Sequence, residues 1–316
     1  MLIWDWIFDS KMVSTIIFLY LLFLILENRQ NKESKEFVEE INTDPSKYSF
    51  EDWFLNGKNA SEEKKYEDAL FYYRKAIELK PDFHEAYNNW GVALGNLAHT
   101  KIGEDAKVLY KQAFDKYKKA IEIKPSFHEA YCNWATDLER LAKTKTGEEA
   151  EVLYKQAFDK YKKAVEIKPD FHEAYYNWGT VLGNLAQAQT GEGAEELYKE
   201  SFEKFKKAIE IKPSNTSHYN NLVYNLILFA KTKTDKEAEN ILKEALDESQ
   251  KAVYLGGNYY NLACCYALLK NKEEALQCLE RSLKRQELTT NLVLKDEDWK
   301  HYLEDKDFLK IIEKYK

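Results

Sequence analysis

The chain has 316 residues, of which 32% are charged, and it contains 11 glycines and 5 prolines. Its formal net charge is −7 at pH 7, which excludes the basic surface of a general nucleic-acid-binding protein. So few turn-forming residues among so many charged ones indicate a protein built of helices with solvated outer faces.

An uncharged segment lies close to the N-terminus. Residues 12–26 read MVSTIIFLYLLFLIL, and Trp4 and Trp6 precede them. A membrane-spanning helix needs roughly 17–25 residues, so the uncharged run alone is slightly short. The apolar residues before Lys11 extend it. Tryptophans also suit the membrane interface. We therefore predict that residues 1–28 form an uncleaved, single-pass membrane anchor.

Basic residues on either side of this segment predict its orientation. Lys11 precedes the uncharged run, whereas Arg29, Lys32 and Lys35 follow it. Because short loops rich in lysine and arginine stay on the cytoplasmic side, the rest of the chain is expected there. Residues 29–49 are mostly polar and are expected to form a linker.

Two other interpretations of the N-terminal segment stay open. It can be the signal peptide of a secreted or periplasmic protein, or an apolar helix that packs against the first repeat. A signal peptide would begin with basic residues and end at a small-x-small cleavage site. Here the segment begins with Asp5 and Asp9 and ends at Leu26–Arg29, which favours the anchor.

A long repetitive region follows the linker. Prolines 44 residues apart mark its units at Pro81, Pro125, Pro169 and Pro213. Similar text follows the first three of them: FHEAYNNWGVALGNLA, FHEAYCNWATDLERLA and FHEAYYNWGTVLGNLA. A fixed period of this size indicates a solenoid, in which each unit packs only against its neighbours.

Each unit is expected to form two helices. Apolar residues recur three and four positions apart in both halves, as at Leu109, Ala113 and Tyr117. The glycines that supply a turn between the halves are Gly103, Gly147 and Gly191. Each of these second helices ends at a Lys-Pro pair, since proline cannot extend a helix. The predicted order is helix, turn, antiparallel helix and corner.

These units resemble the tetratricopeptide repeat (TPR) family, whose unit of about 34 residues has large, glycine, alanine, aromatic, alanine and proline positions in a set order. The first unit follows that order at ordinary length with Trp53, Gly57, Ala69, Tyr73, Ala76 and Pro81. The six expected repeats are 50–83, 84–127, 128–171, 172–215, 216–255 and 256–283. Repeats two to five depart from the family by about ten extra residues between the helices. The resemblance implies an all-α, right-handed α-solenoid of helix hairpins over residues 50–283, preceded by the hydrophobic N-terminal helix.

Residues 284–316 are expected to cap the solenoid. Their apolar residues include Leu292, Trp299, Leu303 and Phe308. The last unit of a solenoid has an apolar face that a cap must cover to keep the protein soluble. Trp299 and Phe308 are therefore expected in the core of the cap.

Residue types that often carry chemistry give no site in this sequence. The four cysteines, at positions 132, 264, 265 and 278, lack redox or zinc spacing and are interpreted as packing residues. His84, His128 and His172 recur on successive repeats, roughly 10 Å apart, which is too far to share one metal ion. We interpret them as helix-start residues. No phosphate-binding loop or hydrolase motif occurs, so we predict no catalysis, metal, cofactor or small-molecule substrate.

One asparagine position recurs on the first helix of the pairs, which in this family lines the concave side of the array. Its members are Asn89, Asn133, Asn177, Asn221 and Asn261, with Tyr176 and Asn220 beside them. An amide both donates and accepts, so a row of amides can hold the backbone of an extended peptide. Some TPR arrays in peptide-binding and glycosyl-transferring proteins use such a ladder, and the resemblance implies one here. The alternative is that these asparagines only pack between helices.

Together these observations predict a membrane-anchored, non-catalytic adaptor that presents its concave groove to a protein or peptide partner. One alternative is a structural scaffold that associates with its own copies. Another is a secreted or periplasmic repeat protein with a cleaved signal.

Overall fold

The computed structural model describes residues 48–316, and within that range the chain is helical without any β-strand. Six hairpins follow one another: α2 Phe50–Glu62 with α3 Tyr66–Leu79, α4 His84–His99 with α5 Gly103–Ile123, α6 His128–Ala142 with α7 Gly147–Ile167, α8 His172–Gln187 with α9 Glu192–Ile211, α10 Thr216–Ala230 with α11 Asp235–Tyr254, and α12 Tyr260–Leu268 with α13 Lys272–Lys284. The all-α solenoid predicted from the repeats is confirmed.

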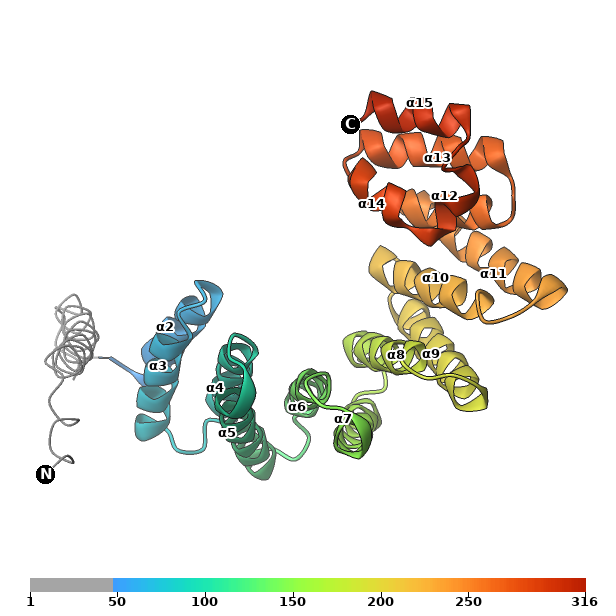
Figure 1. Cartoon of the computed structure of the whole chain (residues 1–316). Helices are drawn as coiled ribbons and strands as arrows, with labels where there is room; N and C mark the ends of the chain where they lie inside the picture. Colours follow the sequence, from blue (N-terminus) through green and yellow to red (C-terminus); the bar gives the residue numbers. More distant parts are fainter. Residues whose placement is uncertain (1–47) are drawn as a thin grey trace, which may run out of the picture.

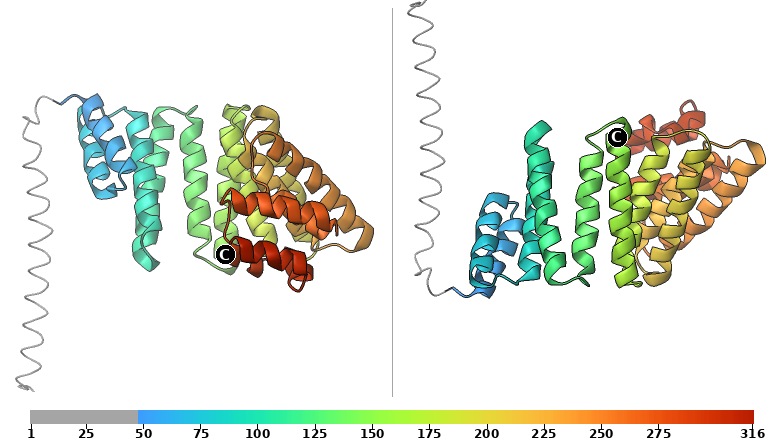
Figure 2. Two further views of the ribbon diagram at one scale, coloured as in Figure 1. Left: turned by 90° about the horizontal axis from the view of Figure 1, so that it is seen from above. Right: turned by 90° about the horizontal axis from the view of Figure 1, so that it is seen from below.

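The hairpins are stacked into an arc. Figure 1 shows α4, α6, α8 and α10 on the inner side of this arc, and α5, α7, α9 and α11 on its outer side. Figure 2 shows the same helices side by side from two further directions. Any residue that several first helices present on a shared face is therefore repeated along the inner side of the array.

Close contact between a small and an aromatic residue holds each of the first four hairpins together. A Cβ atom on Gly91 would lie 2.6 Å from a ring carbon of Tyr117, so only glycine lets α4 approach α5 this closely. The aromatic residues at the position of Tyr117 are all almost fully buried: Tyr73, Tyr117, Tyr161 and Phe205. The small and aromatic positions read from the sequence thus form the core of the hairpins.

The turns between paired helices adopt the conformation that glycine favours. Gly103, Gly147 and Gly191 have φ angles of 64°, 59° and 79°, which cost other residues energy. The helices after the first two of these turns, α5 and α7, each have 21 residues, whereas α3 of the first hairpin has 14. Most of the extra length in these repeats therefore extends the second helix.

The recurring histidines pack across the corners between repeats. The His84 ring meets the Phe127 ring edge-on at 4.7 Å, and His128 meets Phe171 in the same way. His172 lies against His218, with ring centroids 5.1 Å apart. The interpretation of these histidines as helix-start residues is correct for their position, but their side chains also join one repeat to the next.

The C-terminal segment closes the array with α14 Thr290–Lys295, η2 Glu297–Tyr302 and α15 Lys306–Lys314. Trp299 and Phe308 are fully buried and stack with ring centroids 5.5 Å apart. Leu292 and Leu303, by contrast, are exposed. Not every apolar residue of this segment therefore belongs to the core.

The predicted membrane anchor of residues 1–28 and nearly all of the predicted linker lie outside the described residues. None of the helices in residues 48–316 combines the length and the apolar character of a membrane span. The described chain begins just before α2, where the Ser49 side chain accepts a hydrogen bond from the Asp52 backbone, and Asp52 accepts one in return. This capping box fixes where the first hairpin starts.

Candidate functional site

The recurring asparagines all lie on first helices. Asn89 is on α4, Asn133 on α6, Asn177 on α8, Asn221 on α10 and Asn261 on α12, and each is half-buried. The first four of these helices form the inner side of the arc (Figure 1). We call these five residues the amide ladder.

The amide ladder joins each repeat to the one before it. Each bond reaches the residue that directly precedes the previous ladder asparagine. The Nδ2 atoms of Asn133, Asn177, Asn221 and Asn261 donate to Asn88 Oδ1 at 3.0 Å, Cys132 Sγ at 3.9 Å, the Tyr176 hydroxyl at 2.8 Å and the Asn220 backbone oxygen at 3.1 Å. The predicted site residues Tyr176 and Asn220 are thus partners of the ladder within the chain.

Both ends of the ladder are occupied. At the first end, Asn89 accepts a bond of 3.1 Å from Asn88. Burial raises the pKa of the neighbouring Tyr73, an effect that hydrogen bonds with Ser61 and Asn89 partly offset. At the other end the cap takes the place of a further repeat, because the Tyr260 hydroxyl donates to Asp296 over 2.7 Å.

The ladder leaves amide oxygens available. Within residues 48–316 no hydrogen bond reaches Oδ1 of Asn133, Asn177 or Asn221. These oxygens belong to half-buried side chains on one face of successive helices. Each can accept a hydrogen bond from an N–H group of a bound chain.

The face around the ladder is acidic near the helix starts and mostly neutral further along the helices. The residues three positions after the ladder asparagines are Val92, Thr136, Thr180 and Tyr224. Those seven positions after the same asparagines are Asn96, Arg140, Asn184 and Leu228. Residues at these spacings share the face of a helix with the ladder. Four residues before the first three ladder asparagines, on the same face, stand Glu85, Glu129 and Glu173, and each lies within 3.2 Å of the preceding histidine.

A buried charged cluster lies next to the ladder between α4 and α6. Asp137 is only 2% exposed, accepts a 2.7 Å bond from the Tyr117 hydroxyl, and lies 3.2 Å from the Arg140 guanidinium. The same nitrogen of Arg140 donates to Asn96 Oδ1 over 3.0 Å. The motifs of the sequence did not predict this cluster. A signal was nevertheless present, because a charged residue at position 137 replaces the apolar Ala93 and Val181 of the neighbouring repeats.

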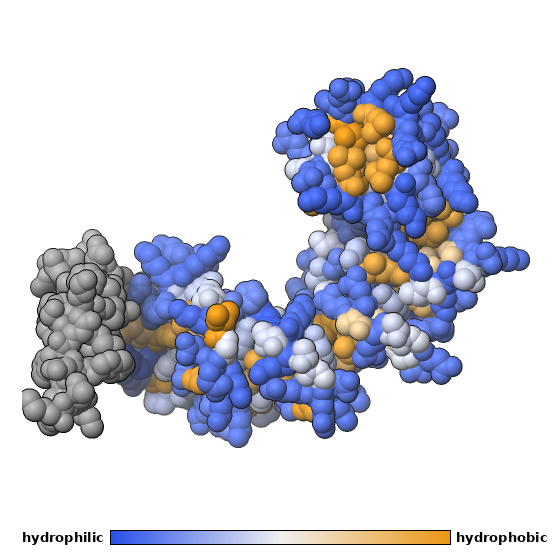
Figure 3. Space-filling model, in the orientation of Figure 1, coloured by the Kyte–Doolittle hydropathy of each residue, from blue (hydrophilic) through white to orange (hydrophobic). Residues whose placement is uncertain are grey.

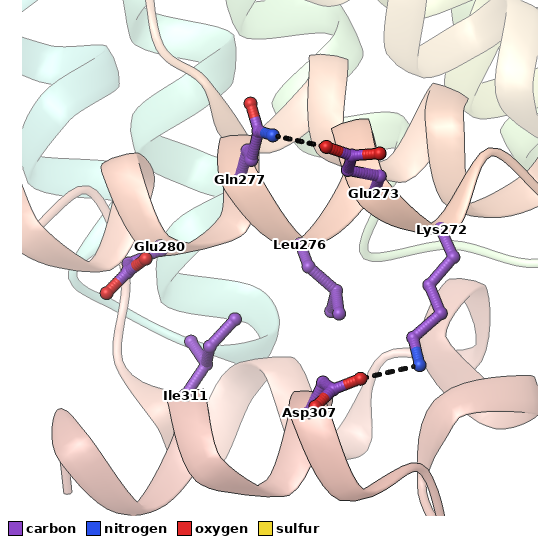
Figure 4. Close-up of a pocket in the computed structure, with 7 residues that line it drawn as sticks. All are labelled: Lys272, Glu273, Leu276, Gln277, Glu280, Asp307 and Ile311. Carbon is purple, nitrogen blue, oxygen red and sulfur yellow. Dashed lines mark hydrogen bonds and ion pairs between the residues drawn. The ribbon is translucent and has the colours of Figure 1, made fainter.

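A second surface groove lies at the end of the array, between α13 and α15. It has a volume of about 460 Å³ and is lined by Lys272, Glu273, Leu276, Gln277, Glu280, Asp307 and Ile311. Figure 4 shows Leu276 and Ile311 facing the space between the helices, with an ion pair of 2.9 Å between Lys272 and Asp307 at one side. Figure 3 shows an apolar patch on this end of the molecule.

Among residues 48–316, one group of side chains has the spacing of metal ligands. Ligand atoms of Cys264, Asp296 and Asp298 lie within 4.8 Å of one another. The ammonium of Lys231 already contacts Asp298, and burial raises the pKa of the Cys264 thiol far above its usual range. Because thiols bind metals as thiolates, this arrangement favours an internal ion pair over a metal.

Comparisons with known proteins agree with the fold. The family model of the tetratricopeptide repeat matches residues 53–83 and 257–287. The structure of pilF from Pseudomonas aeruginosa has a TM-score of 0.53 at 13% identity, with 84% of this chain and 97% of that chain covered. At this identity the similarity concerns the fold alone. No curated protein matches the sequence.

Two further solved structures are more distant in shape. A thermophilic TPR protein of Thermus thermophilus has a TM-score of 0.46 at 16% identity, covering 66% of this chain and 95% of that one. YrrB, a TPR protein with an unusual peptide-binding site, has a TM-score of 0.40 at 21% identity, covering 70% and 95%. The tetratricopeptide repeat model thus matches a hairpin at each end of the array, and the hairpins stacked between them continue the same fold.

Proposed function

We propose that this TPR protein is a non-catalytic adaptor that binds an extended segment of a protein partner along the amide ladder. The TPR fold is that of a scaffold for protein–protein interaction. The observation that carries the proposal is the row of half-buried amide oxygens, on Asn133, Asn177 and Asn221, that no group within residues 48–316 occupies.

The spacing of the ladder suits an extended chain. Packed helices lie about 8–10 Å apart, and an extended chain in the polyproline II conformation advances about 3.1 Å per residue with three residues per turn. One ladder asparagine therefore meets every third residue of a bound segment. Because the amides contact the backbone, the ladder alone selects for extended conformation rather than for particular side chains.

Selection among side chains falls to the neighbours of the ladder. Tyr224 is 47% exposed and stands on the same face of α10 as Asn221. The half-buried residues Thr136 and Thr180 add hydroxyl groups on α6 and α8. This combination favours a partner segment with at least one apolar or aromatic residue to pack on Tyr224.

Affinity capture tests this proposal. The bait is the full-length chain, and the variant bait carries Asn133→Ala, Asn177→Ala and Asn221→Ala. A matched control carries Lys118→Ala, Lys162→Ala and Lys206→Ala at equivalent positions of α5, α7 and α9. We expect a partner that the parent and the lysine variant retain and the asparagine variant loses, with equal helix content by circular dichroism. Equal retention by all three baits would contradict the proposal.

We further propose that residues 1–28 hold the array at the cytoplasmic face of a membrane. The uncharged run of residues 12–26 and the excess of basic residues after it support this placement. The test is to extract cell membranes with alkaline carbonate and to sequence the N-terminus of the protein. The proposal expects the intact N-terminus in the membrane pellet, whereas a mature N-terminus beyond Leu26 would contradict it.

Self-association is a second candidate function. The observation that favours it is the groove between α13 and α15, where Leu276 and Ile311 face open space at the end of the array (Figure 4). Light scattering of the full-length chain in detergent separates the two candidates. A monomer at micromolar concentration would count against assembly through this groove.

A further inference from the structure

Two junctions of the array use the same close contact with different chemistry. A Cβ atom on Gly95 would lie 2.0 Å from Asp137 Oδ2, so the carboxylate of α6 fills the space that this glycine leaves on α4. Two repeats further along the chain, a Cβ atom on Gly183 would lie 1.9 Å from Asn225 Oδ1. A carboxyl group thus fills the space beside the glycine at the first junction, and an amide of nearly the same shape fills it at the second.

The surroundings of Asp137 involve every helix packed against it. The titratable and charged groups that interact with it are Tyr110 and Tyr117 from α5, Arg140 from α6 and Tyr161 from α7, while α4 contributes the uncharged Gly95 and Asn96. Arg140 is the one cation among these groups, and its side chain is 33% exposed. The carboxyl group is therefore enclosed mainly by phenols and backbone.

The second junction has no group that titrates in the same place. Asn225 is 6% exposed and donates from Nδ2 to the backbone oxygen of Asn221 over 2.9 Å. Phe205 stands where Tyr117 stands at the first junction, and Leu228 stands in place of Arg140. The chain itself thus provides a neutral counterpart of the charged cluster.

Burial governs the titration of Asp137. It raises the pKa of this carboxyl to about 7, although the bonds from Tyr117 and Arg140 act in the opposite direction. The folded chain therefore takes up a proton near neutral pH, whereas the unfolded chain does so only near pH 4. Between these values the folded state binds the extra proton, so the junction gains stability as the pH falls.

We propose that the contact between α4 and α6 is a pH-sensitive joint of the array, which tightens when Asp137 takes up a proton and loosens when it ionises. The corresponding contact between α8 and α10 lacks this response, because the Asn225 amide does not ionise in this pH range. On protonation Arg140 also loses its counter-charge and keeps only Asn96. The inner face of the array then carries one more positive charge close to the amide ladder. This inference does not depend on the proposed peptide binding.

Hydrogen exchange of backbone amides in the full-length chain tests the joint at pH 6 and pH 8. After correction for the intrinsic pH dependence of exchange, protection of α4 and α6 should rise about tenfold from pH 8 to pH 6, the ratio expected for a pKa near 7. Protection of α8 and α10 should not rise, because Asn225 does not titrate and because His218 on α10, whose pKa burial lowers to about 4, favours opening as the pH falls. A reciprocal pair of variants supplies the control.

The first variant, Asp137→Asn, copies the second junction and should abolish the change in α4 and α6. The second variant, Asn225→Asp, should create a new pH dependence in α8 and α10. At the lower pH the protonated carboxyl of the introduced aspartate can still donate to the Asn221 backbone oxygen. The variant therefore stays folded at pH 6. The proposal is overturned if Asp137→Asn keeps the pH dependence, or if the parent chain changes equally at both junctions.

Discussion

The Nδ2 atom of Asn221 donates to the hydroxyl oxygen of Tyr176 across 2.8 Å, and this bond ties α10 to α8. The bond uses one end of the Asn221 amide and leaves its Oδ1 without a partner within residues 48–316. Packing between helices and binding of a partner are therefore compatible roles for the ladder. Asn133, Asn177 and Asn221 each donate from their nitrogen to the preceding repeat and keep an oxygen that no hydrogen bond within residues 48–316 reaches.

Removing the Tyr176 hydroxyl should weaken this junction. Tyr176→Phe leaves the half-buried Nδ2 of Asn221 without its closest acceptor, and we expect a loss of about 1 kcal/mol in the free energy of unfolding. Urea titration followed by circular dichroism measures the change. Tyr224→Phe is the matched control, because no hydrogen bond within residues 48–316 reaches the Tyr224 hydroxyl. Equal losses for both variants would contradict the role given to Tyr176.

The close approach inside a hairpin predicts a second effect. Gly91→Ala places a methyl group 2.6 Å from the Tyr117 ring, which has no room to move because it is almost fully buried. Overpacking of this kind costs about 1–3 kcal/mol, and thermal unfolding should show it as a lower midpoint.

A helical glycine without such a close contact offers a control for that substitution. Gly193 lies in α9 with its nearest neighbouring atom 3.6 Å from an added Cβ. Gly193→Ala should leave stability unchanged or raise it by up to about 1 kcal/mol through helix propensity. If Gly91→Ala proved as harmless as Gly193→Ala, the proposed contact with Tyr117 would be wrong.

The cap should be essential for stability. Trp299 is fully buried and stacks on Phe308, and truncating a buried aromatic residue costs about 3–5 kcal/mol. We expect Trp299→Ala to expose the last hairpin, so that protease cleavage begins in α12 to α15. The control is Leu292→Ala, since Leu292 is exposed. Cleavage that begins at the other end of the array would argue against this function of the cap.

The burial of His218 should make the folded chain less stable in acid. Burial, with the neighbouring His172 as the next cause, lowers the pKa of His218 to about 4. The unfolded chain binds this proton near pH 6.5, so the contribution of His218 is lost progressively as the pH falls from about 6.5 to 4.

This loss is measured as the difference between the parent chain and His218→Gln, because Asp137 titrates in an overlapping range with the opposite sign. The stability of the parent relative to the variant should decline as the pH falls through this range. A constant difference would contradict the burial of a neutral His218.

The repeated elements were predictable because each unit carries its own signals. The 44-residue spacing of the prolines, the turn glycines and the small and aromatic positions are local features, and the helices follow them. The buried Trp299 and Phe308 were also expected. The exposure of Leu292 was not, because α14 has only six residues, too few for a periodic pattern to distinguish its faces.

The partners of the ladder could not be read from the sequence. The residues that receive the amide bonds share one position, directly before a ladder asparagine, but their types vary and include Asn88, Cys132 and Tyr176, so residue type does not mark them. Their role arises from the stacking of helices that are distant in sequence. Asp137 had a signal in the neighbouring Ala93 and Val181, but its partners Tyr117 and Arg140 became evident only in three dimensions.

Site-specific photo-crosslinking in cells tests the central claim most directly. A photoreactive phenylalanine analogue replaces Tyr224 on the inner face, and in a matched chain it replaces Tyr254, which is 90% exposed at the end of α11. We predict a crosslinked protein partner from the Tyr224 position and none from the Tyr254 position. No adduct at Tyr224, or equal adducts at both positions, would contradict binding along the amide ladder.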